Sequence, residues 1–248
     1  MKKRAVLVII FALLLSACAV GPFTETMYVQ EDEPATAPEF EAREYYSPEE
    51  MEHTLQFVEY GYGHTGFQLF LPRDWNYSIV EYNADEGEFG IDFWPDGSGE
   101  RKLRLRYYSS AFGVCGTGLV EREGELPGTG KLRVGYYDGQ DYPSFISFYD
   151  SPGGYALMNE LGSGWNAHWE EIEKILSSLV LDPGVMRVSV AEETAQDSCV
   201  WEDYDYLRTD FDILSGSFTV EFVKMGGEKQ ATVILEKYNN EYIVIADE

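Results

Sequence analysis

The chain has 248 residues, with 44 acidic against 18 basic side chains and a formal net charge of −26 at pH 7. So negative a surface opposes binding to nucleic acid or to anionic lipid headgroups, and we expect no nucleic-acid partner. A hydrophobic fraction of 44% and 18 tyrosines indicate a folded protein, long enough for one large domain or two smaller ones.

The N-terminus has the pattern of an export signal. Lys2, Lys3 and Arg4 precede an apolar run over 5–15, which is shorter than the roughly 20 residues of a membrane-spanning helix. Residues 15–18 read Leu-Ser-Ala-Cys, which resembles the lipobox of bacterial lipoproteins. That resemblance implies removal of a signal peptide, attachment of lipid such as palmitate to Cys18, and an extracytoplasmic protein anchored to the cell membrane or outer membrane. The alternative is an ordinary secretory signal, removed near residue 17, with a chance cysteine.

Residues 18–46 have the composition of a tether. They include Pro22, Pro34 and Pro38, and seven acidic residues against one basic residue. Such a segment buries little apolar surface and stays extended. A capping pattern at 47–50 predicts a short helix where the folded part begins.

A glycine-rich stretch at 61–66 matches the GxGxxG pattern of dinucleotide-binding loops. That function requires a helix after the third glycine, whose N-terminus would hold the pyrophosphate. Residues 67–72 instead alternate like a strand and end at Pro72. The stretch therefore predicts a tight hairpin between two strands, and we expect no cofactor.

From 75 to 161 the chain reads as short strands separated by turns that contain glycine and proline. The clearest is 101–108, where Leu103 and Leu105 share one face. Short strands with such turns predict an antiparallel sheet. The other predicted strands are 75–82, 89–94, 119–126, 131–137, 145–149 and 155–161.

The opposite face of strand 101–108 carries a basic stripe, Lys102, Arg104 and Arg106. An exposed row of cations could bind a carboxylate or a phosphate. Glu121 and Glu123, on one face of the next predicted strand, could instead neutralise the stripe in a cross-strand charge ladder. We expect the ladder, which requires these two strands to be neighbours, and keep an anion site as the alternative.

A long amphipathic helix is predicted over about 166–181, because Trp165, Trp169, Ile172 and later apolar residues recur at steps of three and four. Asp182-Pro183-Gly184 would end it. We expect Trp169 to be buried against the sheet. The fold class that follows is α+β, with an antiparallel sheet packed by one long helix over 47–182.

Two stretches resemble the PsbP/Mog1-like α/β/α sandwich. Residues 66–75 read GFQLFLPRDW, and residues 175–179 read ILSSL at the end of the predicted helix. Families with that fold often open and close on similar patterns. The resemblance spans about 66–181 and implies a binding or accessory role, with no catalytic motif to transfer.

Residues 183–248 predict a small β-rich unit. Strands at 217–225 and 229–238 flank Gly226-Gly227, a hairpin signal, and 241–246 completes a three-stranded meander. Residues 192–212 fit a strand or a helix. They end in an acidic cluster, which could hold a metal ion but lacks the glycine of a calcium loop and could equally be a solvated edge. The cluster consists of Asp203, Asp205, Asp210 and Asp212.

Other candidate site residues are few. Cys115 and Cys199 could form a disulfide outside the cytoplasm. The sequence has no HExxH, CxxC or GxSxG pattern. We therefore expect a lipid-anchored, non-enzymatic binding or accessory protein whose partner is an envelope protein or a small molecule. The alternatives are an extracytoplasmic hydrolase with a site assembled from distant residues, and a structural or assembly subunit of an envelope complex.

Overall fold

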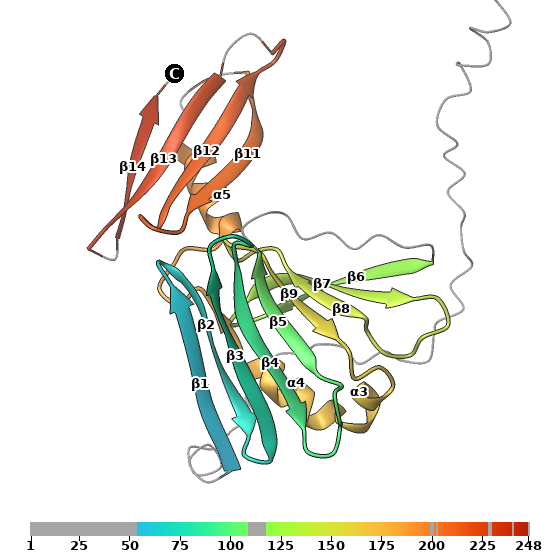
Figure 1. Cartoon of the computed structure of the whole chain (residues 1–248). Helices are drawn as coiled ribbons and strands as arrows, with labels where there is room; N and C mark the ends of the chain where they lie inside the picture. The colour runs from blue at the N-terminus through green and yellow to red at the C-terminus, as the bar shows by residue number, and fades with distance from the viewer. Residues whose placement is uncertain are drawn as a thin grey trace, which may run out of the picture. The chain divides into compact units, whose positions relative to one another are not determined.

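The computed structural model describes residues 54–108, 118–198, 201, 203–227, 230–239 and 241–247 (Figure 1). The predicted signal peptide, tether and helix start lie outside these residues, and so do Cys18, Cys115 and Cys199. The described residues form three antiparallel sheets and three short helices. Strands account for 55% and helices for 15%, so the predicted α+β fold around one long helix is wrong.

The smallest sheet contains the glycine-rich stretch. Its strands are β1 (Leu55–Tyr62), β2 (Thr65–Pro72) and the two-residue β10 (Val180–Leu181), in the order β1-β2-β10. β1 and β2 are joined by Gly63 and His64, and Gly63 has a φ of 62°, as tight hairpin turns require. The prediction of a hairpin at 61–66 is therefore confirmed.

The largest sheet has seven strands in the order β3-β4-β5-β9-β8-β7-β6. β5 thus lies between β4 and β9, while β6 is at the far edge of the sheet and pairs with β7. This order is not the sequence order, and it bears directly on the basic stripe. The strands are β3 (Trp75–Asn83), β4 (Glu88–Pro95), β5 (Leu103–Tyr108), β6 (Leu119–Leu126), β7 (Gly130–Tyr137), β8 (Phe145–Phe148) and β9 (Tyr155–Asn159).

One hydrophobic core is shared by these two sheets. Alternate residues of β2 and of β4 belong to the same hydrophobic cluster, as expected where one face of each strand lies on the core. The aromatic ring of Phe67 stacks with that of Phe89 at a centroid distance of 6.5 Å. The core members on these two strands are Phe67, Leu69, Leu71, Phe89, Ile91 and Phe93.

The predicted long helix is two short ones, α3 (Gly164–Ala167) and α4 (Trp169–Ser178). His168 interrupts them with φ −115° and ψ 21°, and Leu179 is extended because the next two residues join the sheet as β10. Trp165 and Ile172 are buried in the core. Trp169 is partly buried and packs against that core, so the predicted burial of this residue against the sheet is incomplete.

The third sheet has the strands β11 (Tyr204–Asp212), β12 (Ser217–Lys224), β13 (Gln230–Tyr238) and β14 (Glu241–Asp247), in sequence order. It therefore has one strand more than the predicted meander. Of residues 192–212, which fitted a strand or a helix, the first lie in α5 (Val188–Ser198) and the last form β11. Ala191 and Ala195, one turn apart on α5, are fully buried in a second core with one face of this sheet. Their small side chains allow the helix to approach the strands closely.

No helix in the described part of the chain is long and apolar enough to cross a membrane.

Candidate functional site

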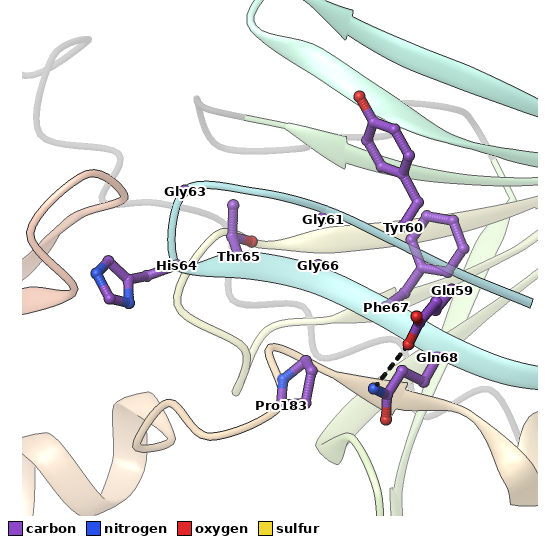
Figure 2. Close-up of a pocket in the computed structure, with 10 residues that line it drawn as sticks. All are labelled: Glu59, Tyr60, Gly61, Gly63, His64, Thr65, Gly66, Phe67, Gln68 and Pro183. Atoms are coloured by element: carbon purple, nitrogen blue, oxygen red, sulfur yellow. Dashed lines mark hydrogen bonds between the residues drawn. The ribbon is translucent and has the colours of Figure 1, made fainter. Parts of the chain in front are cut away.

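The turn end of the β1–β2 hairpin borders a cavity of about 420 Å³, which we call the hairpin groove (Figure 2). Its lining runs from Glu59 to Gln68 along the hairpin and is completed by Pro183, just after β10. The ring of His64 points away from the other lining side chains (Figure 2). Tyr60 and Thr65 point to the opposite side of the hairpin from Glu59 and Gln68, which leaves the last two, on neighbouring strands, as the polar side chains for a ligand (Figure 2).

The side chains on the outer face of the hairpin change from aromatic to polar to glycine toward the turn. Residues two apart on a strand share a face, so three cross-strand pairs lie in a row. The first pair is aromatic, with ring centroids 5.2 Å apart, and Phe57 is 50% exposed. In the second, Gln68 Nε2 donates to Glu59 Oε2 at 3.3 Å. The pairs are Phe57–Phe70, Glu59–Gln68 and Gly61–Gly66.

The glycine pair gives the groove a floor without side chains. A Cβ on Gly66 would lie 2.6 Å from the carbonyl oxygen of Tyr60, closer than atoms can approach. A Cβ on Gly61 would lie 3.0 Å from the carbonyl oxygen of Thr65. The GxGxxG pattern is therefore explained by close backbone packing within a hairpin, since its third glycine begins no helix here.

Behind the groove is a buried polar cluster around Asp182, which is 2% exposed. Its Oδ1 accepts hydrogen bonds from Thr65 Oγ1 at 2.5 Å, from the Gly66 amide at 3.0 Å and from the Tyr155 hydroxyl at 2.8 Å. The Asp182 amide also donates to the Gly66 carbonyl at 2.7 Å. This aspartate thus ties the segment after β10 to the hairpin through both its side chain and its backbone.

Burial raises the pKa of Asp182, against hydrogen bonds from Thr65, Gly66 and Tyr155 that favour the charged form. Burial also raises the pKa of Tyr155 well above its usual value, and the neighbouring Asp182 adds to this shift. Asp182 Oδ2 is buried without a hydrogen-bond partner among the described residues. The Gly153 backbone lowers the pKa of the carboxyl less than the other donors do.

A proton on Asp182 Oδ1 would allow the two hydroxyls of the cluster to bond in one chain, although Oδ2 has no partner among the described residues. The Thr65 and Tyr155 hydroxyls are 2.8 Å apart, and the Tyr155 hydroxyl is 2.9 Å from the Gly66 carbonyl oxygen. Protonated Asp182 could donate to Thr65, which donates to Tyr155, which donates to Gly66. Each hydroxyl then has an acceptor, as buried polar groups require. We call this cluster the latch, and the raised pKa of Asp182 favours its neutral form.

The basic stripe on β5 is paired with acids, but not with those expected. Lys102 and Arg106 both form salt bridges with Asp92 on β4, and Arg104 lies 3.1 Å from Glu160, after β9. Burial raises the pKa of Asp92, yet hydrogen bonds from the two cations bring it below its usual value. These contacts favour an ion-pair role over an anion site.

The predicted charge ladder between β5 and β6 is wrong, because those strands are not neighbours. The acidic face of β6 meets β7 instead, where Glu123 lies 3.7 Å from Arg133. β9 occupies the position beside β5 that the ladder assigned to β6. A connection of about ten residues is long enough to carry the chain to the other edge of a sheet, so consecutive strands need not pair.

The predicted acidic cluster lies on and just before β11 and does not converge. Within the described ranges, no three His, Cys, Asp or Glu side chains are placed to hold a metal ion. Asp210 lies 3.3 Å from Arg208. Asp212 accepts hydrogen bonds from its own turn, at the Leu214 amide and the Ser215 hydroxyl, and these lower its pKa. Asp203 and Asp205 precede them along the same stretch.

Sequence reasoning missed Glu59, Gln68, Tyr155 and Asp182. The alternation of β1 and β2 could have paired the first two once the hairpin turn was placed. Asp182 was interpreted only as a helix stop, and no local pattern joins it to Tyr155.

No protein-family model, curated protein or solved structure matches this chain. The resemblances at 15–18 and 66–181 therefore stay predictions.

Proposed function

We propose that this chain is a lipid-anchored, extracytoplasmic protein of a bacterial envelope that binds a ligand at the hairpin groove. The anchor rests on the lipobox pattern that ends at Cys18. The binding role rests on one observation, the row of an exposed aromatic pair, a carboxylate–amide pair and a glycine floor beside a cavity. Binding sites commonly combine apolar surface with a few convergent polar groups in this way.

The chemistry of the row favours a cationic ligand. Glu59 accepts hydrogen bonds, Gln68 both donates and accepts, and the face of Phe57 attracts an ammonium or guanidinium group. No lysine or arginine lines the groove among the described residues. The net charge of −26 attracts cations at longer range as well.

Binding can be tested by calorimetry with arginine amide and spermidine as cationic probes, and with glutamate and a neutral sugar as comparisons. We expect the cations to bind, and Glu59→Gln combined with Phe57→Ala to abolish binding. Glu193→Gln, an exposed change on α5, is the control that keeps it. Equal binding by the groove variant, or binding of the sugar alone, would refute a cation site.

The anchor has a separate test in detergent phase separation of the protein made in a bacterial host. The native chain should enter the detergent phase, and Cys18→Ser should stay in the aqueous phase. Equal partitioning of the two would refute lipid attachment at Cys18 and leave the groove experiment unaffected.

A further inference from the structure

β14 is the last strand of its sheet, and among the described residues it pairs with β13 alone (Figure 1). Its other edge therefore presents backbone amides and carbonyls without a strand partner there. Such an edge can be extended by a strand from another chain, with main-chain hydrogen bonds supplying affinity.

Three consecutive residues of β14 are apolar and exposed. Ile243, Val244 and Ile245 are 48%, 39% and 46% exposed. Ile234 of β13 is exposed as well and lies directly opposite Ile245 on the same face. Ile234, Ile243 and Ile245 share one face and Val244 lies on the other, and we call these four residues the β14 edge patch.

Three other edges of the described sheets carry the usual protection against pairing. β6 exposes charges at Glu121, Arg122, Glu123 and Glu125. β11 has a register shift near Arg208, and β3 has one near its end. β14 has an unbroken register and charges only at its two ends. Since charges and bulges are what block edge pairing, β14 is more open to pairing than β6, β11 or β3.

The charges around the patch indicate the partner. Glu241 begins β14, and Glu236 lies across from Ile243 on β13. Both are exposed, and neither forms a salt bridge in the described part of the chain. A second copy of this chain would bring the same acids against them, in a molecule of charge −26. A partner with basic residues beside its strand is complementary.

We propose that the β14 edge takes an extended segment of a partner protein as a fifth strand, with an aliphatic centre and lysine or arginine at its ends. Residues at alternate positions would cover Ile243 and Ile245 on one face and Val244 on the other. This site is separate from the hairpin groove, so it does not depend on the function proposed above.

The test uses the full chain in detergent micelles and labelled peptides of about ten residues, a length typical of a long strand. One peptide has a Val-Thr-Val-Thr-Val centre with two lysines at each end, and a second has glutamates in their place. Fluorescence anisotropy should show binding of the lysine peptide, at least about tenfold weaker binding of the glutamate peptide, and weakening by about 0.5 M salt.

Variants locate the site. Ile243→Lys combined with Ile245→Lys should weaken binding at least about tenfold, because lysine on an edge blocks pairing and repels the peptide. Val120→Lys, at an exposed edge position of β6, is the matched control and should change nothing. In the native chain, bound peptide should slow amide hydrogen exchange of β14, a readout that requires no variant.

Three results would overturn the proposal. One is equal binding of both peptides, and another is equal loss of binding in the control variant. The third is self-association of the native chain in sedimentation experiments that the two β14 lysines abolish, since this would assign the edge to a second copy. Loss of cation binding at Glu59 should leave peptide binding unchanged.

Discussion

Asp182 offers the sharpest test of how the hairpin is held. Asp182→Ala removes the acceptor that Oδ1 provides to Thr65, Gly66 and Tyr155. The two hydroxyls can still bond to each other at 2.8 Å, so the Gly66 amide is the donor left buried without an acceptor. Position 182 also has a φ of 48°, which alanine tolerates poorly.

These two effects set the expected size of the loss. An orphaned buried donor costs about 1–3 kcal/mol. Alanine also lacks the local side-chain hydrogen bonding that eases aspartate into the left-handed region, so the backbone adds to this loss. Asp182→Ala should therefore lower the free energy of unfolding by at least about 1–3 kcal/mol. Asp182→Asn keeps an acceptor oxygen and a side chain that tolerates positive φ, so it should cost less than alanine at every pH.

The pH dependence separates a neutral latch from a charged one. Because the folded-state pKa of Asp182 is raised, the folded chain keeps a proton that the unfolded chain has lost. The stability from this group is greatest below the unfolded pKa of about 4 and falls as pH rises toward the folded pKa. Asp182→Asn lacks this titration. The difference in free energy of unfolding between the native chain and Asp182→Asn should therefore shrink as pH rises.

The assay is urea unfolding at a series of pH values from about 4 to 9, with native, Asn and Ala chains compared at each pH. If the loss of unfolding free energy in Asp182→Asn stays constant or grows with pH, the hypothesis that Asp182 is protonated in the folded chain is refuted. An alanine variant within about 0.5 kcal/mol of the native chain would refute the latch itself.

Four further changes test the fold around the groove and the ion pairs of the basic stripe. Asp92→Asn should lower the free energy of unfolding in urea by about 2–3 kcal/mol, which is less than the full cost of breaking a buried pair because the two cations are partly exposed. Arg104→Ala removes an exposed pair and should cost under about 1 kcal/mol. Equal losses in the two variants would contradict this ranking. Gly66→Ala should lower the thermal midpoint, because the added Cβ would meet the backbone of β1, and an unchanged midpoint would show that the strands can separate. Trp165→Ala should cost about 3–5 kcal/mol as a buried aromatic deletion, and a loss below about 1 kcal/mol in chemical unfolding would place the ring outside the core.

Features encoded in a short stretch were predictable from the sequence. The hairpin at 61–66 follows from glycine spacing and from the alternation of 67–72, both of which are local. The long helix was overestimated because apolar periodicity continues through residues that the fold uses differently. His168 leaves the helical conformation, and residues 180–181 pair with β2, which periodicity within the segment cannot reveal.

Features that depend on strand order were not predictable. The charges of the stripe at 102–106 were visible, but their partners depend on β4 and β9 lying beside β5. Asp182 shows the same limit, because its burial depends on Thr65 and Tyr155, which come from distant parts of the chain. Strand alternation predicts which face a residue occupies, whereas the neighbouring strand is a property of the whole sheet.

The pairing of β10 with β2 has a consequence for how the chain acquires its fold. Val180 pairs with Gln68, so the smallest sheet unites segments that are far apart in sequence. Contacts of such long range require loop closure before they contribute stability, which slows folding. If the chain is threaded through a membrane from its N-terminus, Phe67 and Leu69 emerge long before β10. Under that condition we expect the first hairpin to remain an incomplete, aggregation-prone intermediate until residue 181 has crossed, so that folding would depend on protection of that hairpin.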